Sequence, residues 1–359
     1  MRKLTLVLLV GLLVLGIPAA AQDTDPWVCP DGYQGQTLNI FNWSTYIAED
    51  TIPNFEEACG VTVNYDVYDS DDSLINRLRE GNPGYDIIVP SNLGLPTLIR
   101  EELVIPLDYD LIPNAANIAD VYRDTMIDPG DVYSVFYLAG TIGLGYDKTV
   151  ITDNVTSWGQ FFEHDGPIAW IDDSRFMFAL GMLMTGRDPN SFDAEDLQAA
   201  KDFLIANSDN VITIATDDGQ ELLARGEVEM VIEYSGDILQ LNLDCECEDF
   251  VYVVPDEGTA ASTGHIAIPA GAQNPALANV FIDYLLDPQI SADIANYTAY
   301  PTPNQRSIDL GLIDEALINN PGIYPDADTL ARVFFQMPNP DADDMINNAW
   351  DEVKIALSR

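Results

Sequence analysis

The chain has 359 residues, 59 of them acidic and 15 basic, and a formal net charge of −44. Such an excess of negative charge excludes nucleic acid and anionic membrane surfaces as partners, because binding to phosphate groups needs clustered lysine and arginine. The same charge would attract a cationic solute. A role in solubility, or adaptation to a salty habitat, explains most of the negative charge equally well.

The first residues have the pattern of a secretory signal peptide. Arg2 and Lys3 precede an apolar core over residues 4–17, and the alanines at 19–21 offer a small-residue cleavage site. The core is shorter than the roughly 20 residues that span a bilayer, so the pattern favours cleavage over a membrane anchor. We therefore expect residues 1–21 to be removed and the protein to work in the periplasm or outside the cell.

The remaining chain, of about 338 residues, is too long for one compact core and suits two domains. In its first part, three short apolar runs alternate with two helical segments. This β-α-β-α-β order predicts a parallel sheet. The predicted strands are Leu38–Phe41, Val61–Val67 and Tyr85–Val89, and the clearer helix, Ser70–Glu80, stops at Gly81.

A glycine-rich apolar run, Val135–Tyr146, predicts a strand that leaves the first lobe, enters the second and serves as a hinge. A return crossing is expected over residues 256–264. The elements expected in the second lobe are strands at Ile168–Ile171 and Val228–Glu233 and helices at Phe176–Met184 and Ala194–Asn207.

The last part of the chain is expected to return to the first lobe and to end on the second. A strand at His265–Ile268 and a helix at Pro275–Leu286 would belong to the first lobe. Helices near Tyr324–Phe335 and at Asp341–Leu357 would pack on the second lobe.

Two strands of the first lobe are followed by residues suited to contacting a ligand. Trp43 and Ser44 follow the first strand, and Ser91 follows the third. In open α/β sheets, ligands bind beyond the carboxyl ends of the strands, so these side chains are expected to face one crevice. The alternatives are a core tryptophan and turn or capping roles for the serines.

Six segments carry a resemblance to a known family. They are IFNWSTYIAEDTIPNFEEACGVTVNYDVYDSDD, GYDIIVPSN, GLGYDK (143–148), EYSGD (233–237), YPTPN (300–304) and NPGIYPDAD (320–328). In the same order, they resemble the periplasmic spermidine/putrescine-binding proteins, the solute receptors of polyamine ABC importers. The resemblance covers nearly the whole mature chain. It implies a hinged, two-lobed α/β fold of the periplasmic-binding-protein type II, in which helices flank a mainly parallel sheet in each lobe.

The resemblance also implies a layout that periodicity alone does not show. Residues 35–141 and 260–303 would form lobe 1, and residues 142–259 and 304–359 would form lobe 2. It implies a polyamine such as putrescine or spermidine bound between the lobes, a membrane permease as the partner, and a monomer without a cofactor or a metal. A receptor of the same fold for a monoamine, a zwitterionic amino-acid derivative or a sugar is the alternative.

A polyamine site needs carboxylates for the ammonium groups and aromatic rings for the cation and the methylene groups. The resemblance places an acidic contact at Asp173, where capping of the next helix is an equal alternative. It places the main carboxylate at Asp237. The full set of ligand-binding residues that it implies is Trp43, Ser44, Tyr46, Ser91, Asp173, Tyr234, Asp237 and Tyr300.

The chain departs from the family pattern at several expected carboxylates. Arg175 and Phe176 stand where an acidic residue is usual, Ser262 and Gly264 replace an aromatic residue and an aspartate, and Thr45 replaces an acid that some members have. These departures leave the identity of the solute open, including a zwitterion whose carboxylate faces Arg175.

The four cysteines of an exported chain can form disulfides in three pairings. Cys29 and Cys59 each precede one of two adjacent parallel strands, which favours a Cys29–Cys59 bridge and leaves Cys245–Cys247 as a second, tight bridge. A metal site is the weaker alternative, because C-x-C without nearby histidine is poor support for it.

The sequence offers little for an enzyme. Its two histidines, His164 and His265, lie about a hundred residues apart, and no nucleophile elbow, phosphate loop or dinucleotide fingerprint is present. Paired carboxylates abound by composition, so a secreted hydrolase of the glycosidase type remains the alternative to a receptor.

Overall fold

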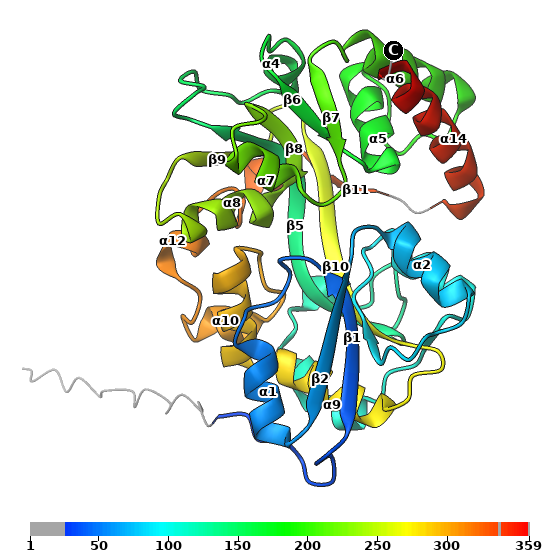
Figure 1. Ribbon diagram of the computed structural model, residues 1–359, viewed down its shortest axis with the longest axis vertical. Helices are drawn as coiled ribbons and strands as arrows, with labels where there is room; N and C mark the ends of the chain where they lie inside the picture. Colours follow the sequence, from blue (N-terminus) through cyan, green and yellow to red (C-terminus); the bar gives the residue numbers. More distant parts are fainter. Residues whose placement is uncertain (1–25, 337–338, 358–359) are drawn as a thin grey trace, which may run out of the picture.

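The computed structural model describes residues 26–336 and 339–357. The predicted signal peptide over residues 1–21 lies outside these ranges. None of the helices within them is both long and apolar enough to cross a bilayer. The described chain forms two lobes, each built of strands flanked by helices, with two long strands passing between them (Figure 1).

One mixed sheet of eleven described strands runs through both lobes, in the order β2-β1-β3-β10-β5-β8-β6-β7, with β4, β9 and β11 at its sides. The two long strands at its centre are β5 (Ser134–Asp147) and β10 (Thr259–Pro269). They are antiparallel and pair from Ala261 opposite Thr141 to Ala267 opposite Ser134. This arrangement confirms the two-lobed α/β fold class.

Lobe 1 begins with the predicted parallel strands. β1 (Thr37–Trp43) lies between β2 (Thr62–Tyr68) and β3 (Ile87–Ile88), and its central residues Ile40 and Phe41 are buried. The register places the last residue of β1 opposite the last residue of β2. The carboxyl ends of these strands therefore meet at the edge of lobe 1 that faces lobe 2 (Figure 1). The helices between and after them are α1 (Thr51–Cys59), α2 (Asp71–Arg79) and α3 (Gly94–Arg100).

Short elements connect lobe 1 to the first long strand. A two-residue strand, β4 (Val104–Ile105), pairs with the end of β10. Three short 3-10 helices follow: η1 (Tyr109–Leu111), η2 (Pro113–Asn117) and η3 (Asp120–Tyr122).

The glycines of β5 have a packing role that the sequence did not reveal. The strand is continuous and almost wholly buried. A Cβ atom on Gly143 would collide with the carbonyl oxygen of Val253 and the ring of Tyr252. A Cβ atom on Gly145 would collide with Ile238. These glycines let the helix α8 (Ser235–Asp244) and the strand β9 (Phe250–Val253) approach β5 closely, whereas their use as a hinge stays a prediction.

Lobe 2 surrounds a second core of large aromatic side chains, including the fully buried Trp158, Trp170 and Phe176. β6 runs parallel to both β7 and β8. The strands are β6 (Ile168–Ile171), β7 (Val211–Ala215), β8 (Met230–Tyr234) and β9 (Phe250–Val253). The helices are α4 (Trp158–Phe162), α5 (Ser174–Met184), α6 (Ala194–Ala206), α7 (Gly219–Ala224), α8 (Ser235–Asp244) and α14 (Pro340–Leu357).

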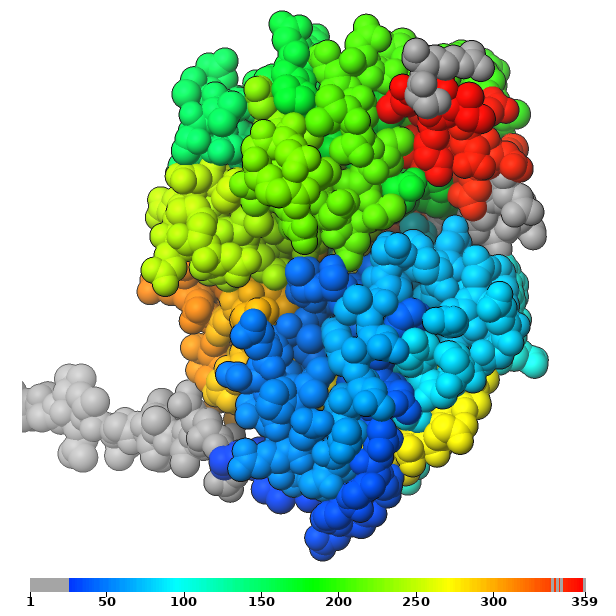
Figure 2. Space-filling model, in the orientation of Figure 1, coloured from blue at the N-terminus to red at the C-terminus, as the bar shows by residue number. Residues whose placement is uncertain are grey.

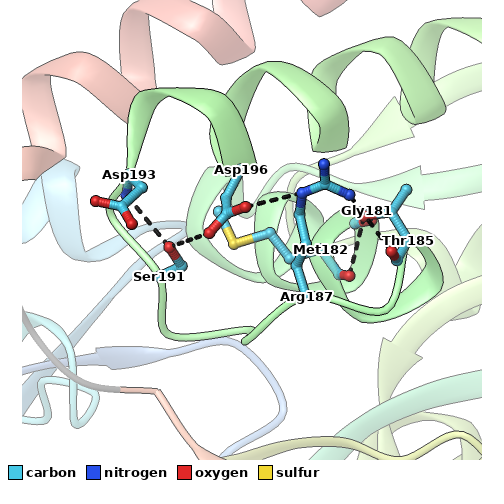
Figure 3. Close-up of polar contacts among 7 residues, drawn as sticks. All are labelled: Gly181, Met182, Thr185, Arg187, Ser191, Asp193 and Asp196. Carbon is cyan, nitrogen blue, oxygen red and sulfur yellow. Dashed lines mark hydrogen bonds and ion pairs between the residues drawn. The ribbon is translucent and has the colours of Figure 1, made fainter.

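Polar contacts fix the connection between α5 and α6 (Figure 3). Arg187 donates from Nε to Asp196 at 2.8 Å, and Ser191 donates to the same carboxylate at 2.5 Å. The Thr185 hydroxyl donates to the carbonyl oxygens of Gly181 and Met182 at the end of α5. One aspartate of α6 thus holds the loop that follows α5, and the two helices pack side by side.

The return of the chain to lobe 1 adds α9 (Pro275–Leu285) and α10 (Pro288–Thr298). The following short elements are α11 (Gln305–Asp309), α12 (Glu315–Ile318), α13 (Ala327–Leu330) and β11 (Val333–Phe335). The helix predicted near Tyr324–Phe335 is confirmed only as the short α13, and the end of the range was wrong, because Val333–Phe335 forms β11 and pairs with β10. Backbone pairing to a long strand outweighs the weak helical preference of this segment.

The apolar cores divide along the long strands. Lobe 1 packs Ile40, Phe55 and Phe281 together, and lobe 2 has the aromatic core of Trp158 and Trp170. A further cluster joins α8, α10 and α12 beside the lobes through residues such as Ile238, Ala295 and Leu317. The exact lobe boundaries given above stay a prediction.

Both disulfides have the pairing that the sequence favoured. Cys29 is bonded to Cys59, the last residue of α1, and Cys245 is bonded to Cys247 after α8. The first bridge ties the segment before β1 to the helix that precedes β2, as expected for neighbouring parallel strands.

Candidate functional site

A cleft runs between the lobes, along the boundary between the blue-to-cyan and the green parts of the molecule (Figure 2). It has two connected parts. The inner chamber, with a volume of about 40 Å³, is lined by Trp43, Ser44, Tyr46, Ser91, Asp217, Tyr234, Asp237, Ser262, Thr263, Gly264 and Tyr300. The outer chamber, of about 270 Å³, shares Trp43, Ser91, Tyr234 and Ser262 with it and extends to Asp71 and Asp173.

Trp43 forms the lobe 1 wall of both chambers. It ends β1, and its indole nitrogen donates to the carbonyl oxygen of Val89 at 2.8 Å. Its ring packs against Tyr68, with 4.6 Å between the ring centroids. This hydrogen bond and the contact with Tyr68 hold the indole in one orientation where it lines the cleft.

The loop after Trp43 reaches across the cleft to lobe 2. The Ser44 hydroxyl donates to Asp217, and the Thr45 hydroxyl donates to Asp237 at 3.0 Å. Gln240 of α8 donates to the carbonyl oxygen of Thr45 at 3.3 Å. Thr45 has φ 51°, a left-handed conformation that is uncommon for a β-branched residue and marks a strained position. With this backbone conformation, the neighbouring hydroxyls of Ser44 and Thr45 each reach a carboxylate of lobe 2.

Asp237 lies in the first turn of α8, with 6 % of its surface exposed. It accepts hydrogen bonds from Thr45 and from the Tyr300 hydroxyl, the latter at 3.0 Å. Burial raises the pKa of Asp237 to about 6, and these hydrogen bonds oppose the rise. Gly236 lets the Tyr300 ring pack directly on the start of α8, where a Cβ atom would overlap it.

A cluster of rings completes the inner end of the chamber. Tyr46 packs edge-on against Tyr300, with ring centroids 5.0 Å apart, and against Tyr137 at 5.5 Å. Tyr234 ends β8 on the lobe 2 side. Burial, followed by the carboxylates of Asp173 and Glu233, raises its pKa well above the usual value, so the phenol stays neutral.

Asp217 is a site residue that the sequence reasoning missed. It follows β7, a strand that was not predicted, and lies beside Asp237. Burial raises its pKa to about 7, the Ser44 hydrogen bond opposes this, and Asp237 adds to it. The signal that could have found it is the position of the Asp217-Asp218 pair beyond a strand end in lobe 2.

Asp71 is the second missed carboxylate. It starts α2 but turns toward the cleft, where it accepts from the backbone nitrogen of Ser91 at 3.0 Å and from the Ser91 hydroxyl. Burial raises its pKa to about 6, and the carboxylate of Asp173 adds to the rise. In the sequence, the segment DSDD (69–72) indicates the start of a helix. Only the fold shows that Asp71 turns its carboxylate into the cleft.

Asp173 caps a helix, as one of the two alternatives had it, and also lines the outer chamber, while its contact with a ligand stays a prediction. It is the N-cap of α5 and accepts from the backbone nitrogen of Phe176 at 2.8 Å. Burial raises its pKa, although Arg175 opposes the shift. The guanidinium of Arg175 lies over the ring of Phe192, 4.7 Å from its centroid.

Glu233 lies behind the inner chamber on β8, with 2 % of its surface exposed. It accepts from the backbone nitrogen of Tyr234 at 2.9 Å. Burial and the neighbouring Asp237 hold its pKa well above the usual range. Among the described residues, none of Asp71, Asp217, Asp237 and Glu233 forms an ion pair with a lysine or arginine.

The structure brings all eight predicted ligand-binding residues to one cleft. Seven line the inner chamber, and Asp173 lines the outer chamber. Of the departures from the family pattern, Ser262 lines both chambers and Gly264 lies against the Tyr46 ring, in space that a Cβ atom would share. Asp217 and Asp71 provide carboxylates in place of those that the sequence lacks at the expected positions. Contact of these side chains with a ligand stays a prediction.

Within residues 26–336 and 339–357, no group of three or more His, Cys, Asp or Glu side chains is arranged to hold a metal ion. The carboxylates are instead spread along the cleft between aromatic rings. Such an arrangement suits organic cations, because carboxylates accept from ammonium groups and the ring faces attract the same charge.

Comparisons with known proteins agree with this chemistry. Residues 51–323 match the family described as bacterial extracellular solute-binding protein. The putrescine-binding periplasmic protein PotF of Escherichia coli (strain K12) is 32% identical over 340 residues, covering 89% of this chain and 91% of its own. The spermidine/putrescine-binding periplasmic protein of Salmonella typhimurium is 27% identical, with 97% of each chain covered.

The solved structures include similar molecules. A putative spermidine/putrescine ABC transporter protein from Listeria monocytogenes superposes with a TM-score of 0.82 at 30% identity, covering 89% of this chain and 99% of its own. The substrate-binding protein PotD from Streptococcus pneumoniae gives a TM-score of 0.76 at 26% identity, covering 90% of this chain and 100% of its own.

Proposed function

The chain belongs to the family of bacterial extracellular solute-binding proteins, and we propose that it is the receptor of an ABC importer for a polyamine of the putrescine or spermidine type. The ligand binds in the cleft between the lobes, with an ammonium group in the inner chamber.

The observation that carries this proposal is the pair of carboxylates in the inner chamber. The charge of Asp237 raises the pKa of Asp217, and among the described residues neither carboxylate forms an ion pair with a lysine or arginine. Burying an uncompensated charge is expensive, so the chamber favours a ligand that brings positive charge.

The aromatic walls favour an alkyl ammonium over an inorganic cation. Trp43 and Tyr234 line the chamber from opposite lobes, and Tyr46 and Tyr300 close its inner end. A cation over such rings gains roughly 0.5–2 kcal/mol. The rings also cover methylene groups, which a hydrated metal ion does not offer.

Ligand binding couples to the arrangement of the lobes because each lobe supplies part of the chamber. Trp43, Ser44 and Ser91 come from lobe 1, while Asp217 and Asp237 come from lobe 2. A ligand that contacts both walls has its highest affinity for the closed arrangement and therefore shifts the population toward it. The closed receptor would then deliver the solute to a membrane permease.

Isothermal titration calorimetry on the mature protein from residue 22 tests the proposal. The ligand panel comprises putrescine, spermidine, agmatine, amino acids and sugars. We expect saturable binding of at least one polyamine and none of neutral sugars. If an amino acid or a sugar binds while every amine fails, the amine function is wrong, although a receptor of this fold remains.

The variant Asp237→Asn tests the central contact. We expect it to weaken amine binding by well over tenfold, because it leaves a buried ammonium group without its main counter-charge. The matched control is Asp244→Asn, which removes the same charge from an exposed position of the same helix. Equal affinities of the two variants would contradict the assignment.

The proposal extends to the form of the protein in the cell. The mature chain starts after residue 21 and acts as a monomer that does not turn over its ligand. The intact mass of the exported protein and light scattering on it measure the first two properties. Hydrolysis of chromogenic glycosides by the purified protein would support the enzyme alternative instead.

A further inference from the structure

A disulfide at the end of α8 joins two cysteines that are separated by a single residue. Cys245 is the C-cap of the helix, and Cys247 follows Glu246. Neither cysteine lines the inner or the outer chamber of the cleft. We propose that this bridge is a thiol–disulfide exchange site, at which the protein oxidises a dithiol on another molecule and stays folded in both redox states. This activity does not depend on the proposed function of the cleft.

The loop that contains the bridge is closed by Asn242 as well as by the disulfide. The Asn242 side chain accepts from the backbone nitrogen of Phe250 at 2.9 Å and donates to the carbonyl oxygen of the same residue at 2.7 Å. The carbonyl oxygen of Asn242 accepts from the backbone nitrogen of Cys247 at 3.0 Å. These hydrogen bonds join the end of α8 to the start of β9. Because a bridge with a sequence separation of 2 removes little entropy from the unfolded chain, its reduction leaves the loop closed and the fold intact.

The reduced form finds hydrogen-bond acceptors already in place. The Sγ atom of Cys245 lies 3.8 Å from the carbonyl oxygen of Asn242, and the Sγ atom of Cys247 lies 3.8 Å from Oδ1 of the same residue. A disulfide sulfur carries no hydrogen and cannot donate to these oxygens, whereas a thiol is a weak donor. Asn242 therefore stabilises the dithiol through two contacts that the disulfide cannot make.

The residue between the cysteines is held in an unfavourable backbone conformation. Glu246 has φ 51°, in the left-handed region that favours glycine. Such a conformation persists in a residue with a side chain only where the surrounding structure imposes it. The bridge fixes both neighbours of Glu246, so its opening allows this residue to relax. Strain that is released on reduction makes a disulfide a better oxidant.

The bridge is accessible to an attacking thiolate, in contrast to the other disulfide. Cys245 is exposed and Cys247 is half-buried. In the other disulfide, Cys59 is 1% exposed and belongs to the core of lobe 1. Exchange requires access to a sulfur atom, so the Cys29–Cys59 bridge serves as an internal reference for a structural disulfide in the same chain.

The exchange proceeds in two steps. A thiolate of the substrate attacks Sγ of the exposed Cys245, a mixed disulfide forms, and Cys247 leaves as a thiolate that takes a proton from water. The second thiolate of the substrate then attacks the substrate sulfur of the mixed disulfide and releases Cys245, which is protonated in the same way. The substrate loses two electrons and two protons and becomes a disulfide, while the bridge becomes a dithiol.

The charge around the bridge selects the substrate. Four acidic side chains flank the two cysteines in the sequence: Asp244, Glu246, Glu248 and Asp249. Among the described residues, none of the four forms an ion pair with a lysine or arginine. Their field repels an anionic thiol and attracts a thiol that carries positive charge. The preferred substrate is therefore a dithiol in a basic setting, such as a lysine-rich peptide with two cysteines.

The first test compares the two disulfides of the folded protein. The mature protein from residue 22 is incubated with dithiothreitol at pH 8 without denaturant, thiols are trapped with iodoacetamide, and peptide mass mapping locates them. We expect Cys245 and Cys247 to be alkylated at least about tenfold faster than Cys29 and Cys59. The selectively reduced protein should melt within about 3 °C of the oxidised protein by circular dichroism.

The second test measures the preference for positive charge. Cysteamine, 2-mercaptoethanol and glutathione carry a positive, a zero and a negative net charge, and their rate constants, corrected for the fraction of thiolate, should fall in that order at low salt. The difference between cysteamine and glutathione should shrink in about 1 M salt. Replacement of both flanking glutamates, Glu246→Gln with Glu248→Gln, should narrow the difference at low salt. The matched control, Glu57→Gln with Glu195→Gln, removes the same charge from exposed positions on α1 and α6 and should leave it unchanged.

The third test follows the oxidation itself. When the protein is mixed with a lysine-rich peptide that has two cysteines, the thiols lost by the peptide should equal those gained at Cys245 and Cys247. The double variant Cys245→Ser with Cys247→Ser should fold, melt within about 3 °C of wild type and lose this reaction. It should bind putrescine as wild type does, so failure of the exchange activity and failure of the amine function are distinguishable.

Three results would overturn the exchange site. They are equal rates of reduction for the two disulfides, reduction of Cys245–Cys247 only on unfolding, and a double variant that fails to fold or melts far below wild type. The last two would show that the bridge is structural. Rates that do not depend on the charge of the thiol would refute the preference for a basic substrate.

Discussion

Amine affinity should fall steeply as the pH is lowered from 8 to 5, because the inner chamber must lose protons to receive a cation. In the free protein, burial raises the pKa of Asp217 to about 7 and that of Asp237 to about 6. A bound ammonium group stabilises the ionised forms and lowers both values. The ligand itself stays charged over this range, since an alkyl ammonium group has a pKa of about 10.

The size of the effect follows from these values. At pH 8 both carboxylates are almost fully ionised, so the affinity has its full value. At pH 5 the protonation of Asp217 reduces the affinity by about 100-fold and that of Asp237 by about tenfold, or about 1,000-fold together. The two groups interact, so the measured midpoints belong to the pair rather than to either residue.

Calorimetry with putrescine in buffers of different ionisation enthalpy measures both the affinity and the number of protons released. At pH 6.5 we expect about one proton per ligand from the inner pair. The variant Asp217→Asn should lose most of the pH dependence between pH 6 and 8. A Kd that changes less than threefold from pH 8 to 5, or an identical profile for this variant, would refute the reasoning.

Three other expectations concern stability and packing. Burial raises the pKa of Asp217, so its ionisation disfavours folding as the pH rises through about 7. Asp217→Asn should therefore raise the melting temperature of the ligand-free protein at pH 8, with a gain in the free energy of unfolding of about 1–3 kcal/mol. A lower melting temperature would contradict this expectation. Gly94→Ala should push the Asp71 carboxylate aside, because the added Cβ atom would overlap it, and should lower the free energy of unfolding in urea; an unchanged free energy would show that the loop absorbs the added atom. Replacing Cys29 and Cys59 by serine opens a bridge with a sequence separation of 30 and should lower the free energy of unfolding in urea by about 3–4 kcal/mol. Removal of the other bridge, with a separation of 2, serves as the control and should cost much less.

The local pattern of the sequence was sufficient for the elements of lobe 1. Apolar runs, a capping serine and the glycine stops predicted β1, β2 and α2 to within a few residues, because each signal lies within a short window. The local pattern failed where pairing between segments distant in sequence determines the secondary structure. β11 was predicted as part of a helix because its partner, β10, lies more than sixty residues away in sequence.

The candidate site shows the same division. Trp43, Ser91 and Asp237 could be predicted because each follows a strand or lies within a segment that resembles a family. Asp217 was missed because the strand before it, β7, was not predicted, and Asp71 because its DSDD segment also signals a helix start in a chain that has acidic pairs throughout. Their partners, Ser44 and Ser91, lie 173 and 20 residues away, so their burial depends on the assembled cleft.

The sequence alone determined the class of the protein: a two-lobed α/β solute-binding protein. It did so because periodicity, strand-end chemistry and motif order are properties of the chain itself. Only the tertiary structure decided which of the many carboxylates are desolvated and how they are divided between the chambers. That division depends on the pairing of β5 and β10, which brings the strand ends of both lobes together and removes a few acids from water.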